Sequence, residues 1–362
     1  MNLVANKRHL LISALVLLLL PLGLQAMGNF WVRIADFALL YVLLALGLNI
    51  VVGFAGLLDL GFVAFFAIGA YLYGLLASPH LGETFEWIAQ VFPDGLHTPI
   101  WVVIPLAALV AGIFGVLLGA PTLKLRGDYL AIVTLGFGEI IRVFLNNLDH
   151  PVNITNGPKG LGQIDSISIA GLNLGKRLDL GFMDVSSVTL YYYLFLALVV
   201  VSYLVCSRLE RSRIGRAWMA IREDEIAAKA MGINTVNLKL LAFGMGATFG
   251  GVSGAMFAAF QGIVSPESFS LMESVMIVAM VVLGGIGHLP GVILGAVLLS
   301  ALPEVLRWVS GLLDLQAATG GRLDASILRQ LLIALAMIIV MLLRPRGLWP
   351  SPDHGKSLQK SA

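Results

Sequence analysis

No charged side chain interrupts the twenty residues Trp101–Ala120, whose sequence is WVVIPLAALVAGIFGVLLGA. A helix of this length rises about 30 Å, which matches the hydrocarbon core of a bilayer. The rest of the chain has the same character: 58% of its 362 residues are hydrophobic and only 12% are charged. A water-soluble domain carries about 25% charged residues and has no place for so much apolar surface. The sequence therefore predicts an integral membrane protein.

Nine further segments are similarly long and mostly apolar, and together the ten predict an all-α, glycine-rich bundle of about ten transmembrane helices. The ten segments are 9–28, 31–50, 57–77, 99–120, 129–148, 189–208, 238–262, 270–287, 290–308 and 327–343. Two of them, 57–77 and 270–287, are rich in glycine and polar residues, which favours broken or re-entrant elements. We expect a single transmembrane domain over 1–346, followed by a cytoplasmic tail at 347–362.

Lysine and arginine are unevenly distributed between the two sides of this bundle. With a cytoplasmic N-terminus, 15 of the 23 lie on the cytoplasmic side and four in outside loops, while the remaining four lie near outer span ends. Positively charged loops stay in the cytoplasm, so both termini and the loop 209–237 are expected there. The large loop 149–188 is then periplasmic. Lys7-Arg8 before an apolar run is also typical of a secretory signal, so the first span is either a retained helix or a cleaved leader.

Motifs of catalysis and of cofactor binding are missing from the sequence. It contains no G-x-x-x-x-G-K-[ST], H-E-x-x-H, C-x-x-C or G-x-S-x-G pattern, and the single cysteine, Cys206, allows neither a disulfide framework nor a thiolate metal cluster. The net charge of +2 gives no support for nucleic-acid binding. We expect a protein that is not an enzyme and that binds no cofactor or metal itself.

The loop 209–237 contains the clearest local motif, Glu225-Ile-Ala-Ala-Lys-Ala-Met-Gly232. Asp224 is suited to cap a short helix, Gly232 to end it, and Glu225 to pair with Lys229 four residues later. A small apolar surface would then remain, formed by Ala227, Ala228, Ala230 and Met231. Such a helix suits docking into a groove of a soluble partner. A surface connector with solvated charges is the alternative.

Ionisable residues inside the predicted spans are costly in hydrocarbon. The candidates for a polar lining of a pathway are Asp59, Glu139, Arg142 and Glu273. Glu139 and Arg142 are spaced to pair on one helix face, as are Glu304 and Arg307. Ion pairing that only holds the bundle together is an equally open interpretation.

Glycines recur every four residues in two of the predicted spans. Because this spacing aligns them on one helix face, they predict close helix packing rather than substrate contact. They are Gly246, Gly250 and Gly254 in the seventh span, and Gly287, Gly291 and Gly295 at the start of the ninth.

Several longer stretches resemble the LivM-type permeases of branched-chain amino-acid ABC importers. They are Gly56–Gly61 with Ala67–Tyr71, Leu125–Ile141, Gly215–Trp218 with Ile221–Glu225, and Val264–Phe269 with Val282–Gly287. The pattern Glu225-x-Ala-Ala-x-x-x-Gly232 is similar to the coupling loop of ABC importer permeases, apart from one inserted position, Ile226. The resemblance extends from about Asp36 to Arg344.

This resemblance implies a permease subunit that forms half of the translocation pathway of an ATP-driven importer in the bacterial inner membrane. The implied partners are a LivH-type second permease, two cytoplasmic ATPase subunits that use ATP and Mg²⁺, a periplasmic amino-acid-binding protein and membrane lipids. The ATPase contact would fall on Glu225, Ala227, Ala228 and Gly232, and the inserted Ile226 leaves open which alanine enters the groove. The alternative is a secondary transporter of small polar solutes driven by an ion gradient, with Glu139 coupling the ion.

Overall fold

The computed structural model describes residues 3–92, 96–122, 127–169, 171–179, 184–312 and 347–349, together with five single positions between 331 and 342. Its helices are α1 (Leu3–Met27), α2 (Asn29–Leu48), the π-helix η1 (Asn49–Phe54), α3 (Val63–Leu76), α4 (His80–Thr84), α5 (Glu86–Val91), α6 (Ile100–Thr122), α7 (Asp128–Asn147), η2 (Gly157–Lys159), α8 (Ser187–Glu210), α9 (Arg213–Glu223), α10 (Glu225–Ala230), α11 (Thr235–Gln261), η3 (Pro266–Phe269), α12 (Leu271–Gly284) and α13 (Leu289–Leu312).

The strands are confined to two small hairpins in the loop between α7 and α8. In the first, β1 (Ser168–Ile169) pairs antiparallel with β2 (Leu172–Asn173). In the second, β3 (Leu178–Asp179) pairs antiparallel with β4 (Asp184–Val185). Helices dominate the described residues, so the predicted all-α membrane architecture is confirmed.

Five helical segments in the described residues are long and apolar enough to cross a bilayer. They are Asn29–Phe54, Ile100–Thr122, Tyr129–Asn147, Ser187–Glu210 and Thr235–Gln261. Shorter apolar helices lie in the first, third, eighth and ninth predicted spans. The tenth predicted span, 327–343, falls for most of its length outside the described residues, as does the tail beyond 349.

The two segments suspected of being broken both contain short helices. α3 and α12 have 14 residues each, so each rises only about 21 Å, less than the thickness of the hydrocarbon core. In the third predicted span the helix begins at Val63 rather than at residue 57. Two hydrogen bonds to side chains explain why the helix begins later than predicted. Gly61 N donates to Asp59 Oδ1 over 2.8 Å, and Leu60 N donates to Thr134 Oγ1 of α7 over 3.0 Å. Both amides are thereby diverted from helical partners.

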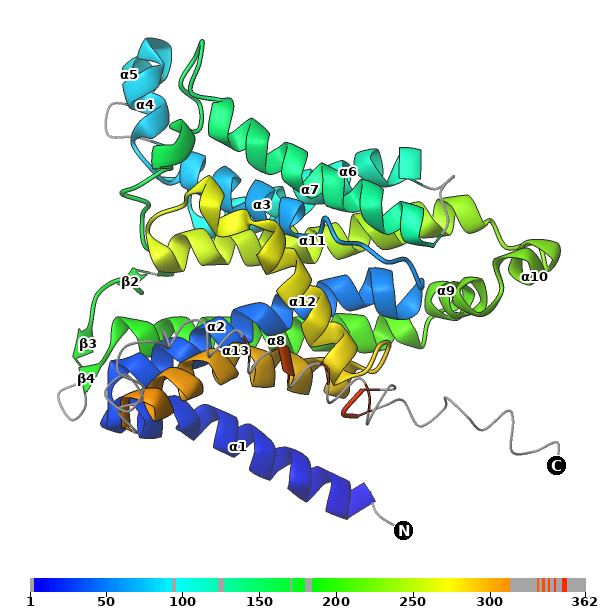
Figure 1. The fold of residues 1–362 in the computed structure, drawn as a ribbon. Helices are drawn as coiled ribbons and strands as arrows, with labels where there is room; N and C mark the ends of the chain where they lie inside the picture. The colour runs from blue at the N-terminus through cyan, green and yellow to red at the C-terminus, as the bar shows by residue number, and fades with distance from the viewer. Residues whose placement is uncertain are drawn as a thin grey trace, which may run out of the picture.

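α11 is the central helix of the bundle, and it packs against α2, α3 and α6 (Figure 1). Its glycine ladder lies where these contacts are closest. Gly246 faces Val51 and Gly47, Gly250 faces Phe65, and Gly254 faces the backbone of Phe66. Small side chains allow the helix backbones to come this near.

The second glycine group divides between a helix and a turn. Gly291 and Gly295 of α13 pack closely against Gly284 of α12. Gly287, in contrast, precedes α13 and lies in the turn between α12 and α13 with φ +82°. Gly287 therefore does not continue the helical ladder, and this expectation is corrected. A glycine suits the position because its backbone adopts a positive φ that other residues rarely adopt.

Replacing Gly254 by alanine is expected to lower the stability of the bundle by about 1–3 kcal/mol, as overpacking of a tight contact does. A Cβ at this position would overlap the carbonyl oxygen of Phe66, so the α3 and α11 backbones would have to separate. Gly136 of α7 provides the matched control, because a Cβ there meets no atom within 4 Å. Thermal unfolding of the two purified variants in detergent measures the difference, and equal midpoints would contradict the packing role.

The two ends of the bundle carry different elements (Figure 1). The start of α1 lies at the same end as α9 and α10, whereas α4, α5 and the hairpins lie at the opposite end. Residues 347–349 belong with α9 and α10, because Leu348 N donates to Leu283 O at the end of α12. At the opposite end Trp87 and Trp101 are 66% and 61% exposed, as is typical of side chains at a membrane–water interface. Elements predicted to share a side of the membrane therefore share an end of the molecule.

Candidate functional site

α9 and α10 are defined by side-chain caps within the loop 209–237. Ser212 Oγ accepts from Gly215 N at the start of α9. Asp224 separates the two helices, because its Oδ1 accepts from Ile226 N over 2.8 Å and from Ala227 N over 3.1 Å. Asp224 is thus the cap that the sequence predicts.

The end of α10 is set by Gly232, which has φ +82°. Gly232 N donates to Lys229 O and Ile233 N donates to Ala228 O, each over 3.1 Å. This pair of bonds is the Schellman motif, and it requires a left-handed residue at the position of Gly232. The sequence prediction of a short helix that stops at this glycine is confirmed.

The exposed face of α10 differs in one residue from the predicted surface. Ala228 is only 4% exposed and packs against the bundle, whereas Ile226 is 69% exposed and Met231 is 83% exposed. Ala227 and Ala230 are exposed between them. The predicted surface is therefore corrected: Ile226 replaces Ala228 in it, because α10 packs with the side that carries Ala228 against the bundle.

Two contacts hold the loop 209–237, which carries α9 and α10 and is called the α9–α10 loop below, against α11. Trp218 is fully buried, and its Nε1 donates to Leu238 O over 2.7 Å. Glu225 Oε2 lies 2.8 Å from Nζ of Lys239, a lysine whose side chain is only 7% exposed. The sequence pairs Glu225 with Lys229, four residues away on the same helix, whereas this ion pair joins α10 to α11. No sequence pattern predicts either contact, because each joins residues of different helices.

Arg222 at the end of α9 is a third contact, and it joins distant parts of the chain. Its Nη1 donates over 2.5 Å to the carbonyl oxygen of Gly53, in the last turn of η1. Its side chain also packs against Gly56 and Gly287. Burial lowers the pKa of the Arg222 guanidinium, and the nearby Glu223 acts in the opposite direction.

The α12–α13 turn belongs to the same junction, because Gly287 N donates to Asn49 Oδ1 of η1 over 2.9 Å. A cavity of about 290 Å³ lies beside it, between Gly56, Gly127, Arg222 and Lys239. Three segments therefore meet at Arg222: the α9–α10 loop, η1 before the non-helical approach to α3, and the turn after α12. We refer to this meeting point as the Arg222 junction.

Replacing Trp218 by alanine is expected to destabilise the protein by about 3–5 kcal/mol, the usual cost of removing a buried aromatic side chain. Phenylalanine at this position loses the hydrogen bond to Leu238 O and part of the buried ring volume, and it should cost less than alanine, about 1–3 kcal/mol. Exposed Trp87, replaced by alanine, is the control. Thermal unfolding in detergent tests the ranking, and a Trp218→Ala variant as stable as Trp87→Ala would contradict it.

The candidate lining residues occupy two places in the bundle. Asp59 is 1% exposed and lies where the chain between η1 and α3 touches α7. The neighbouring Leu60 carbonyl accepts from Ser274 Oγ of α12 over 2.5 Å, next to Glu273, whose carboxylate accepts a hydrogen bond from the Tyr41 hydroxyl. Asp59 and Glu273 thus flank the point where the two short helices begin.

Glu139 and Arg142 lie further along α7 and form the predicted pair, with 2.5 Å between Arg142 Nη2 and Glu139 Oε1. Arg142 Nη1 also lies 3.2 Å from Glu267 Oε1 of η3. The Glu139 side chain remains 41% exposed. Glu304 and Arg307 also pair as predicted, over 2.9 Å. Within the part of the chain that the structure describes, no three His, Cys, Asp or Glu residues are grouped to hold a metal ion.

Comparison with known proteins agrees with this architecture. The family described as "Branched-chain amino acid transport system / permease component" matches residues 30–342. The high-affinity branched-chain amino acid transport system permease protein LivM of Salmonella typhimurium strain LT2 is 42% identical over 331 residues, which cover 88% of this chain and 70% of the relative. LivM of Escherichia coli K12 is 40% identical over 343 residues, covering 91% and 72%.

A more distant relative is the permease protein LivH of the same Salmonella typhimurium strain. It is 23% identical over 321 residues, which cover 87% of this chain and 93% of LivH. No solved structure matches the chain. Because the family match extends across nearly the whole helical bundle, the chain belongs to the permease components of branched-chain amino acid transport systems.

Proposed function

We propose that this permease is half of the transmembrane pathway of an ABC importer that carries branched-chain amino acids across the bacterial inner membrane. A LivH-type permease would form the other half, since relatives with both names match this chain. Two ATPase subunits would act at the end that carries α9 and α10, which the distribution of lysine and arginine assigns to the cytoplasm. A periplasmic binding protein would dock on the loops at the opposite end.

The observation that carries the proposal is the Arg222 junction. α10 presents an exposed apolar face to the solvent, while α9 holds the carbonyl of Gly53 through Arg222. A partner that displaces α10 therefore moves a segment that is bonded to η1 and packed against Gly287. Those two sites are connected to α3 and α12, the short helices of the bundle. Movement at the loop can thereby reach the elements that are best placed to open and close a path.

The energetic requirement of such coupling is modest. A ligand shifts an equilibrium between two states only by its difference in affinity for them. ATP bound between the two ATPases, together with the docked binding protein, would supply that difference. The permease then needs no tight substrate site of its own, because the binding protein provides selectivity.

The face of α7 that carries Glu139 is the proposed surface toward the second permease. Glu139 and Glu267 keep 41% and 70% of their side chains exposed, although they lie at or near a spanning helix. Charged groups facing lipid are costly, so such side chains generally face a protein interior or a water-filled cavity. Pairing with a second permease would provide both.

Co-purification and uptake test the proposed function together. A tagged version of this chain, produced with its candidate partners, should retain two ATPases and a second permease. Vesicles that contain this complex should accumulate leucine when ATP and the loaded binding protein are supplied. Uptake that follows an ion gradient without the ATPases would contradict the proposal and favour the secondary transporter.

A further inference from the structure

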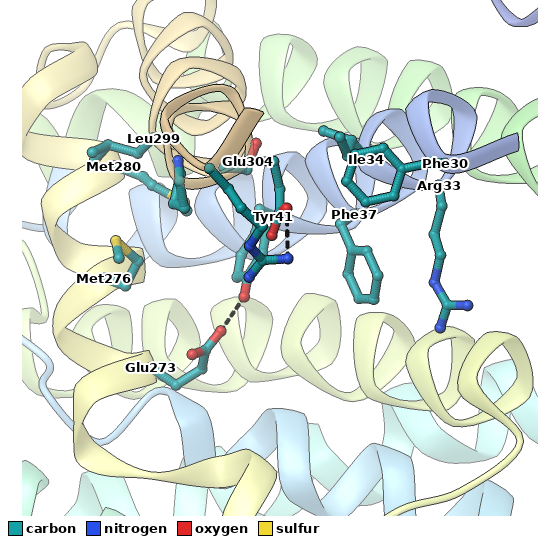
Figure 2. Close-up of a pocket in the computed structure, with 13 residues that line it drawn as sticks. Phe30, Arg33, Ile34, Phe37, Tyr41, Glu273, Met276, Met280, Leu299 and Glu304 are labelled. Atoms are coloured by element: carbon teal, nitrogen blue, oxygen red, sulfur yellow. Dashed lines mark hydrogen bonds and ion pairs between the residues drawn. The ribbon is translucent and has the colours of Figure 1, made fainter. Parts of the chain in front are cut away.

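A cavity of about 360 Å³ lies between α2, α12 and α13 (Figure 2). Most of its wall is apolar, and Figure 2 shows Phe37 on one side and Met276, Met280 and Leu299 on the other. Most of the α2 and α13 residues that line it come from the first half of α2 and the second half of α13, so it lies in the half of the bundle nearer α4 and α5. The distribution of lysine and arginine predicts that this half faces the outer side of the membrane.

The polar groups of the cavity form two pairs. The Tyr41 hydroxyl donates to the Glu273 carboxylate, and Glu304 Oε2 lies 2.9 Å from Arg307 Nη1. The Arg307 side chain is 58% exposed and that of Glu304 is 25% exposed. The cavity therefore offers both a guanidinium and carboxylates within an otherwise apolar wall.

Arg33 also borders the cavity, but its guanidinium contacts residues of α11. Its Nη2 donates to Gln261 Oε1 over 2.5 Å, and its guanidinium lies 5.5 Å from the centre of the Phe260 ring. Figure 2 shows this side chain extending away from Tyr41 and Glu304. Arg307 is consequently the cation that a ligand in the cavity would meet.

The inner end of the cavity adjoins the break in the bundle. Glu273 lies in the first turn of α12, and the next residue, Ser274, donates to Leu60 O in the non-helical approach to α3. Transporters commonly bind their substrate at discontinuous helices, because backbone groups that are outside regular helix can form hydrogen bonds to the substrate there. A molecule leaving the cavity inward would therefore reach the segments that the Arg222 junction controls.

We propose that this cavity is a transient, low-affinity site for a free amino acid with an apolar side chain, on its way from the outer side to the break between α3 and α12. This inference rests on the proposed function. The carboxylate of the amino acid would exchange for Glu304 on Arg307, and its ammonium group would bind Glu273. Glu304 gives up its contact with Arg307 when the amino acid binds, and the cost of losing that ion pair keeps binding weak, so the site can empty. Flexible Met276 and Met280 suit branched side chains of different shape.

Cysteine labelling tests occupancy directly. Ser300 lines the cavity, and Cys206, the single cysteine, is buried. In a Cys206→Ser background, Ser300→Cys in the importer complex without binding protein should react with a membrane-impermeant maleimide, scored by the mass shift of this chain. Millimolar leucine should slow the reaction. Leucinamide, which lacks the carboxylate, and isocaproate, which lacks the ammonium group, should each protect about tenfold less well, since each loses one charge-assisted contact.

Charge variants test whether the site is used during transport. Glu273→Gln and Arg307→Gln should each lower leucine uptake about tenfold, while ATP hydrolysis stimulated by the loaded binding protein persists. Arg307→Lys should recover part of the uptake, because the positive charge is restored. Glu86→Gln, an exposed residue of α5 outside the cavity, is the matched control and should transport normally.

The outcomes separate this inference from the proposed function. If the wild-type complex takes up no leucine with ATP and binding protein, the proposed function itself fails. If the wild type transports but leucine gives no protection and the charge variants transport normally, the cavity inference is overturned. Labelling that changes with the phosphatidylethanolamine content of the vesicles, and not with leucine, would also overturn it and assign the cavity to a lipid headgroup.

Discussion

Replacing Gly232 by valine is expected to abolish ATP-driven uptake while the protein remains inserted in the membrane. Gly232 has φ +82° and ends α10 through the bonds to Lys229 O and Ala228 O. A left-handed conformation costs a residue with a Cβ about 1–2 kcal/mol, and a β-branched side chain is the least tolerated there. Valine should therefore undo the turn and move Met231 and the rest of the exposed α10 face.

The effect at Gly232 is expected to come from the backbone alone. A Cβ at this position meets no atom within 4 Å, so steric overlap contributes nothing in the isolated chain. Asparagine tolerates the left-handed region, and Gly232→Asn should keep most of the uptake. Radiolabelled leucine uptake, with immunoblotting of the membrane fraction, measures both properties. Wild-type transport by the valine variant would count against the role of this helix.

The second large effect is expected for Arg222→Ala. The substitution leaves the Gly53 carbonyl without the donor seen in the structure, and an unmet buried acceptor costs about 1–3 kcal/mol. Coupling between the α9–α10 loop and η1 should weaken correspondingly. We expect uptake per ATP hydrolysed to fall about 5- to 150-fold, the range to which that free energy corresponds.

The control for Arg222 lies six residues earlier. Arg216 is on the same helix, is exposed, and bonds only locally to Arg211 O in the structure. Arg216→Ala should leave the ratio of uptake to ATP hydrolysis unchanged. Measuring both rates in vesicles separates lost coupling from lost assembly. If Arg222→Ala transports with normal stoichiometry, the Arg222 junction does not transmit the movement.

These predictions concern one mechanical path. The α10 face would receive the push, Asp224 and Gly232 would keep that helix intact, and Arg222 would pass the displacement to η1 and to the α12–α13 turn. The Glu225–Lys239 pair and Trp218 hold the same loop to α11, which packs closely on α3 through Gly250 and Gly254. The loop is therefore fixed to the bundle at several points, so that its movement is not absorbed locally.

The features that the sequence predicted correctly depend on neighbouring residues. Asp224 caps α10 because its side chain reaches the amides two and three residues later, and Gly232 ends the helix by its own backbone conformation. The Glu139–Arg142 and Glu304–Arg307 pairs follow from i,i+3 spacing on one helix. The prediction of broken or re-entrant elements in the third and eighth spans rests on local composition, and both spans contain short helices.

The features that it missed depend on residues far apart in the chain. Arg222 and Gly53 are 169 positions apart, and Tyr41 and Glu273 are 232 apart. Lys239 rather than Lys229 is the partner that the structure shows for Glu225, because packing of α10 on α11 brings it near. Ala228 is buried for the same reason.

Three properties are already evident in the amino-acid sequence: the protein is a membrane protein, its helices pack closely at glycines, and a short capped helix forms in one loop. Those properties follow from the length of the apolar segments, from side-chain size and from hydrogen bonds within a few residues. They do not depend on contacts between distant parts of the chain. The contacts that hold that loop, and the charges that share a cavity between α2, α12 and α13, become visible in the folded structure alone. Both depend on the packing of helices that are far apart in the sequence, and residue spacing within one helix does not predict that packing.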